Sequence, residues 1–143
     1  MTACLLAAVL CCPWAAQLDI GAVRSEPDLE KRSDRALDHA HKTLDRAQRA
    51  YRDNDVDGAE TALAAIREAV DLSVDSLRAT GKNPRRSPKY FKRAEIQMRK
   101  LARRLEEFRT AMAVDDRVLV EPLVAHARTV HEALLTGIMS KNK

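Results

Sequence analysis

Basic side chains concentrate in one short segment, and their spacing suggests chemistry more directly than that of any other residues. Residues 82–104 contain 10 lysines and arginines and a single acidic residue, Glu95, which gives the segment a net charge of +9. Residues 17–79 are mildly acidic, with 10 basic and 14 acidic side chains, so the net charge of the whole chain is only +4. A dense group of cations attracts anions, and it also keeps a helix surface soluble.

Most of these cations fall on one side of a helix that we predict over residues 89–112. Apolar residues recur there at alternating spacings of three and four, which is typical of a helix that buries one face. When Met98, Leu101 and Leu105 face the core, the cations lie on the opposite side. The candidate binding face consists of Arg85 and Arg86 in the preceding loop, and of Lys89, Lys92, Arg93, Arg99, Lys100 and Arg103 on the helix.

We expect this basic face to bind an anionic partner, either a component of the cell envelope or an acidic protein. A solvated helix face without a partner is the alternative explanation of the same pattern. Nucleic acid is disfavoured, because Tyr90 is the only nearby aromatic side chain that could stack on bases. Stable binding to a membrane surface needs apolar residues that are free to enter lipid, and among the cations only Ile96 meets that condition.

The four histidines suggest a second class of function, the binding of a metal or a small ligand. If the first and fourth helices are neighbours, His41, His126 and His131 lie at a similar level along the helix axes. Their spacing argues against a shared metal, since His126 and His131 lie about 140° apart on an ideal helix and no Glu-x-x-His pair is present. We therefore predict no metal site, and we expect His39 to point to solvent.

The sequence lacks the motifs of the common catalytic and cofactor sites. It contains no phosphate-binding glycine loop, no Gly-x-Ser-x-Gly, no His-Glu-x-x-His and no Cys-x-x-Cys-His. Met98 and Met112 stand at core spacings, so they favour core filling over haem ligation. These observations predict a protein that is not an enzyme and uses no cofactor.

The first residues are similar to an export signal. Residues 3–12 form an apolar run too short to span a bilayer, and Trp14-Ala15-Ala16 offers a cleavage site. No charged residue precedes Asp19, so the usual basic start is missing, and an uncleaved apolar tail on a cytoplasmic protein is the alternative. We predict a signal peptide over residues 1–16 and a bacterial periplasmic or extracellular location, with no membrane span after cleavage. All three cysteines lie within this segment: Cys4, Cys11 and Cys12.

Four helices of similar length should follow a flexible lead-in over residues 17–27. We predict them over residues 28–52 (or 33–52), over 56–79, over 89–112, and from Asp115-Asp116 to about Met139. Asp55, Ser87 and the Asp115-Asp116 pair are expected to cap helix starts, and Pro122 to distort the first turn of the last helix. Short connections favour antiparallel hairpins, so the sequence predicts an all-α, four-helix up-down-up-down bundle as one domain of residues 28–143.

Two patterns resemble known families. The run from His131 to Met139 and the turn Asp115-Asp116-Arg117 resemble parts of uncharacterised exported helical proteins of environmental bacteria. That resemblance covers the last third of the chain and implies an exported helical protein without implying an activity. The first two helices also carry a pattern similar to one tetratricopeptide unit. Because about three such units are needed for a stack, a helical adaptor stays a third alternative.

Overall fold

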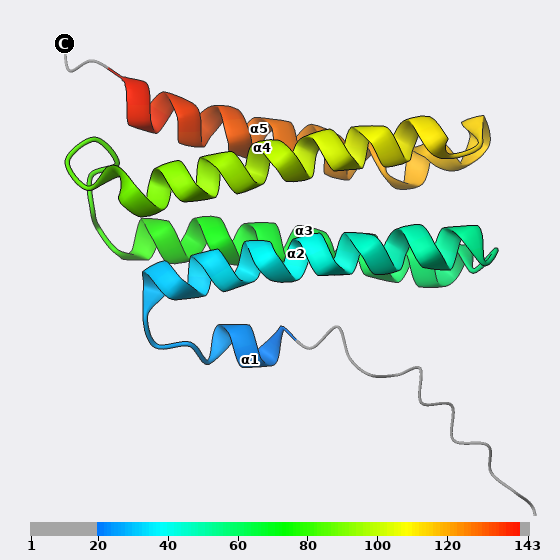
Figure 1. The fold of residues 1–143 in the computed structure, drawn as a ribbon, viewed down its shortest axis with the longest axis horizontal. Helices are drawn as coiled ribbons and strands as arrows, with labels where there is room; N and C mark the ends of the chain where they lie inside the picture. Colours follow the sequence, from blue (N-terminus) through cyan, green and yellow to red (C-terminus); the bar gives the residue numbers. More distant parts are fainter. Residues whose placement is uncertain (1–19, 141–143) are drawn as a thin grey trace, which may run out of the picture.

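The protein is all-α in the computed structural model, which describes residues 20–140 (Figure 1). No strand occurs within those residues. The elements, in chain order, are α1 (Gly21–Arg24), α2 (Leu29–Arg52), α3 (Val56–Ala79), α4 (Pro88–Ala111), the 3₁₀ segment η2 (Val114–Leu119) and α5 (Glu121–Met139). The predicted signal peptide, residues 1–16, lies outside the described part of the chain.

The starts of α2 and α3 are fixed by aspartates that accept backbone hydrogen bonds. Asp28 Oδ1 accepts from the N–H groups of Glu30 and Lys31, at 3.0 and 3.1 Å, and Asp55 Oδ1 accepts from Gly58 at 2.8 Å. These bonds satisfy N–H groups that have no partner within a helix. The short turn between the helices makes them an antiparallel hairpin. The predicted bounds of α3 are confirmed, and of the two starts predicted for α2 the structure has the earlier one, with Asp28 as the cap.

The connection from α3 to α4 is longer and is ordered by its own polar groups. Gly81 takes a positive φ of 63°, a conformation that costs glycine little. Asn83 Oδ1 accepts from the backbone N–H of Arg85 at 2.9 Å. Ser87 stands at the N-cap position of α4, but it makes no side-chain capping bond. The prediction that the Ser87 side chain caps the helix is therefore wrong, although the helix begins where the sequence predicts.

The last predicted helix is divided in two. Residues Val114–Leu119 form 3₁₀ turns, and the α-helix starts only at Glu121, with Pro122 in its first turn. Asp115 and Asp116 make no side-chain capping bond. Asp116 Oδ2 instead accepts from the Tyr51 hydroxyl at 2.8 Å, so this carboxylate ties the tip of the second hairpin to the end of α2.

Part of the expected lead-in is packed against the helices. Within the described residues 20–27, Ile20 is buried and Val23 packs against the core. Arg24 in α1 forms an ion pair with Glu68 of α3. The flexible lead-in predicted over residues 17–27 is thus corrected for residues 20–27, because two aliphatic side chains bury apolar surface there.

The two hairpins stack so that α2 lies against α4, and α3 lies against α5. Figure 1 shows that α2 and α4 run in one direction along the molecule, whereas α3 and α5 run back. The expectation that the first and last long helices are neighbours is therefore wrong. Instead, the connection between α3 and α4 joins two helices that lie diagonally across the group of four. A single core joins the four long helices, and its largest fully buried residues include Leu37, Leu44, Ile66, Leu77, Met98, Leu101 and Leu105.

Candidate functional site

All eight residues of the predicted basic face are exposed. The buried side of α4 carries the residues expected there: Phe91, Ala94, Met98, Leu101, Leu105 and Phe108. One flank of the helix contacts α2, and the other flank contacts α5. The remaining outward side holds the cations, which are continued by Arg85 and Arg86 in the loop before the helix. We call these eight residues the basic face.

Four cations of the basic face have a partner within the molecule. Arg93 Nε lies 2.6 Å from Asp34 Oδ1 of α2. The pairs of Arg99 with Glu95 and of Arg103 with Glu107 are looser, at 3.8 and 3.6 Å. Lys89 Nζ stands 5.2 Å from the centre of the Tyr90 ring, in cation–π range. Only Arg93 is held by a carboxylate of another helix, so it also belongs to the contact between α2 and α4.

The other four cations have no side-chain partner among residues 20–140: Arg85, Arg86, Lys92 and Lys100. An exposed and unpaired cation keeps its full charge available to an outside group. Lys82 differs, because its Nζ donates to Glu30 Oε1 of α2 at 2.8 Å. That hydrogen bond raises the pKa of Lys82 and ties it to the first hairpin.

The start of α4 carries charges of the wrong sign for a helix N-terminus. Acidic residues are favoured there because they complement the helix dipole. Acidic side chains occupy the first turns of α2, α3 and α5, whereas α4 has none and its Ser87 makes no capping bond. Lys89 stands in this turn instead. Local electrostatics alone would not select this arrangement.

Three of the four histidines lie at three different helix contacts. His126 Nε2 pairs with Asp71 of α3 at 2.7 Å, and His131 Nε2 pairs with Glu95 of α4 at 2.9 Å. His41 faces α4 from α2, and His39 is half-buried rather than pointing to solvent as expected. Within residues 20–140 no group of three or more potential ligands is arranged to hold a metal ion.

His41 is held in one neutral form by two hydrogen bonds. Its Nε2 donates to the backbone carbonyl of Gln97 at 3.2 Å, while Arg104 Nη1 donates to its Nδ1 at the same distance. A guanidinium can only donate, so Nδ1 must carry a lone pair. Burial and the nearby Arg104 lower the pKa of His41, partly offset by the Gln97 carbonyl, Asp38 and Asp45.

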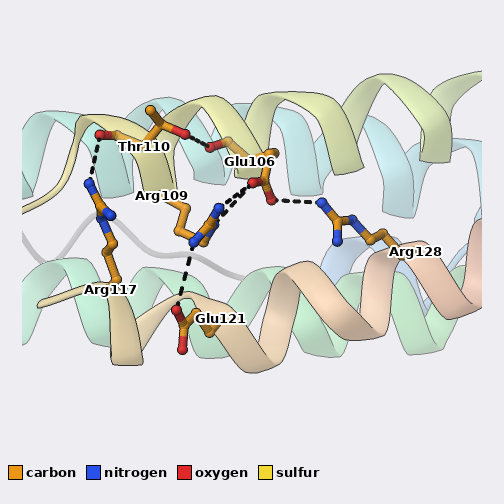
Figure 2. A network of polar contacts seen from close by, with 6 residues as sticks. All are labelled: Glu106, Arg109, Thr110, Arg117, Glu121 and Arg128. Carbon is orange, nitrogen blue, oxygen red and sulfur yellow. Dashed lines mark hydrogen bonds and ion pairs between the residues drawn. The ribbon is translucent and has the colours of Figure 1, made fainter. Parts of the chain in front are cut away.

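A network of charged groups joins α4 to α5, and the sequence analysis missed it (Figure 2). Glu106 accepts from Arg109 at 2.5 and 3.1 Å and from Arg128 of α5 at 3.0 Å. Arg109 also lies 3.8 Å from Glu121. The bond from Arg109 lowers the pKa of Glu106. The spacing of Glu106 and Arg109 is visible in the sequence, but the approach of Arg128 depends on how the helices pack.

Two surface grooves occur away from the basic face. One, of about 380 Å³, lies over α3 and is lined mainly by charged residues, among them Arg24, Arg67, Glu68, Asp71 and Asp75. The other, of about 290 Å³, is bordered by the charged network of α4 and α5. No helix within residues 20–140 has the length and apolar character needed to cross a membrane. Neither groove includes a residue of the basic face.

The comparisons with known proteins provide no relative from which a function could be transferred. Neither the protein-family models nor the curated proteins nor the solved structures give a match to this chain.

Proposed function

We propose that this chain is an exported, non-catalytic protein of the bacterial cell envelope that binds an anionic partner through its basic face. The proposal includes a signal peptide over residues 1–16. The observation that carries it is the set of four exposed cations that no described residue neutralises: Arg85, Arg86, Lys92 and Lys100.

The start of α4 supports this proposal independently. Cations at a helix N-terminus destabilise it by roughly 0.3–1 kcal/mol. Sequences break such local rules mainly where function requires it. A first turn that carries Lys89 and lacks an acid fits a surface selected for its positive charge rather than for helix stability.

We also propose that residues 28–143 form a four-helix bundle. Its support is the core that draws buried side chains from all four long helices, including Leu44, Ile66, Leu101 and Leu123. A tetratricopeptide adaptor would instead stack helix pairs and expose a concave surface between them. Two grooves on the described residues are small and lined mainly by charged residues, and neither is an extended concave surface of that kind.

Elution from a heparin resin in a salt gradient tests the binding of anions by the basic face. In the first variant Arg86→Gln, Lys92→Gln and Lys100→Gln are combined. In the matched control the exposed cations Lys42, Arg52 and Arg67 are replaced by glutamine. Both sets lack side-chain partners among the described residues, and both lower the net charge by three.

We expect the first variant to elute at clearly lower salt than both the wild type and the control. If three contacts are lost, the slope of log affinity against log salt should fall by about 2–3. The control should lose little, because its cations are scattered over α2 and α3. Equal elution of the two variants would show that only net charge matters and would remove the proposal.

A further inference from the structure

Exposed apolar side chains accompany the basic face. Five large hydrophobic residues are exposed within residues 20–140, and three of them lie on α4 and α5: Ile96 at 40%, Leu135 at 39% and Met139 at 69%. The sequence places Leu135 on the apolar side of its helix, so its exposure is a finding of the structure. The other two, Val114 and Val118, lie in η2, at the opposite end of the hairpin.

The register between α4 and α5 places these residues on one surface. His131 bonds to Glu95, and Leu135 and Met139 follow His131 at intervals of four on the same flank of α5. The two helices are antiparallel (Figure 1), so this flank continues alongside the turns of α4 before Glu95. Those turns carry Lys92 and Lys89. The exposed end of α5 therefore borders the basic face.

Ile96 lies in the middle of the cations. Residues three and four positions away are the surface neighbours of a helical residue. For Ile96 all four of these neighbours are basic: Lys92, Arg93, Arg99 and Lys100. Lysine and arginine can lay their aliphatic stems beside an apolar group while their charged ends reach outward. This arrangement presents an apolar centre with a cationic rim.

We infer that this combined surface docks on an anionic lipid bilayer, with Ile96, Leu135 and Met139 entering the headgroup region. The inference rests on the proposed binding of anions by the same face. A soluble polyanion would use the cations but would gain little from the apolar residues. A stable protein partner would need a contiguous, shape-matched surface of about 800 Å² on this chain. A fluid bilayer accepts scattered apolar side chains among cations, because no fixed shape has to be matched.

Photocrosslinking at single positions of the full chain tests the inference. p-Benzoylphenylalanine is placed at position 96 or 139, with position 118 as the exposed control at the other end of the hairpin. Each protein is irradiated with vesicles of phosphatidylglycerol and phosphatidylcholine, and with vesicles of phosphatidylcholine alone. The apolar segment over residues 3–12 is present in every variant, so differences between positions do not arise from it.

We expect lipid adducts at positions 96 and 139 to exceed those at 118 several-fold on the anionic vesicles. The excess should disappear on neutral vesicles, and also when Arg86→Gln, Lys92→Gln and Lys100→Gln are added. Adducts no more abundant at 96 and 139 than at 118 would overturn the inference. If the heparin comparison still separates the two triple variants, the proposed function stands and the partner is a soluble polyanion or an acidic protein. If it does not, both proposals fail.

Discussion

The two helix hairpins bury different kinds of side chain. Alanine is the most frequent buried residue of α2 and α3, whereas the buried residues of α4 are mainly large, such as Met98, Leu101 and Phe108. Small side chains let two helix backbones approach closely, and α2 and α3 form the most extensive contact between elements. The hairpin of α4 and α5 depends on side-chain volume and on charged groups at its edge. The second hairpin also carries the helical part of the basic face and the exposed large apolar residues.

The hairpin packed through small residues thus differs from the one that carries the proposed binding face. A core of small residues tolerates little addition of volume, and a core of large residues tolerates little removal. The comparison can therefore be tested by enlarging a buried alanine of the first hairpin and by shortening a large buried residue of the second.

The largest effect is expected from Leu101→Ala in α4. Leu101 is fully buried, so removing three carbons leaves a cavity and should lower the free energy of unfolding by about 2–5 kcal/mol. Urea denaturation followed by circular dichroism measures this change. A loss below about 1 kcal/mol would show that the second hairpin collapses to fill the space and is not held by side-chain volume.

A somewhat smaller loss is expected from Ala40→Leu in α2. Ala40 is fully buried, so the added carbons must push helices apart or force strained rotamers, at a cost of about 1–3 kcal/mol. The matched control is Ala64→Leu on the exposed side of α3, which should stay within about 0.5 kcal/mol of the wild type. Equal stability of the two variants would mean that the α2–α3 contact is loosely packed.

The charged edge of the second hairpin should contribute less. Glu106→Gln removes the negative charge between Arg109 and Arg128 and one of the two acceptor oxygens, and the expected loss at neutral pH is up to about 1 kcal/mol because the groups are partly exposed. The pKa of Glu106 is lowered below its ordinary value of 4.5. Its stabilisation is therefore complete above pH 4.5 and disappears as the pH falls through the lowered pKa. The variant and the wild type should converge in strong acid, and a constant difference would exclude this cause.

The smallest effect is expected from His41→Gln, at the contact between α2 and α4. The pKa of His41 is lowered from 6.5, so the unfolded chain takes up a proton there before the folded protein does. Its contribution is present above pH 6.5 and is lost as the pH falls toward the folded pKa, since a proton on Nδ1 would oppose Arg104. Thermal unfolding between pH 7 and pH 5 should show less acid destabilisation for His41→Gln than for the wild type. An unchanged pH profile would contradict this role.

Much of the local structure could be predicted because its causes are local. The spacing of Leu63, Ile66 and Val70 identifies a buried helix face, and Asp28 and Asp55 mark helix starts through bonds to residues two or three positions away. The division of the last helix was harder, because Asp116 is used by Tyr51, which lies 65 residues earlier. A hydrogen-bond donor far away in the sequence can thus occupy a carboxylate that would otherwise cap a helix.

The candidate site could be predicted only in part. Periodicity correctly put the six helical cations of the basic face on the exposed side of α4, since a helix that buries one face exposes the opposite one. It did not reveal that Arg93 pairs with Asp34, because the choice of neighbouring helix depends on the whole fold. It also counted Leu135 with the core, whereas this residue, near the end of α5, is 39% exposed among the described residues.

The alternating direction of the four long helices has a consequence for the field around the molecule. Each helix carries a macrodipole equivalent to roughly half a positive charge at its first turn. α3 and α5 run the opposite way, so their negative poles lie at the end where α2 and α4 start, and the four dipoles largely cancel. The sign of the field at this end is therefore set by charged side chains, among them Arg85 and Arg86. A negatively charged body would therefore turn the protein during approach, so that this end arrives first.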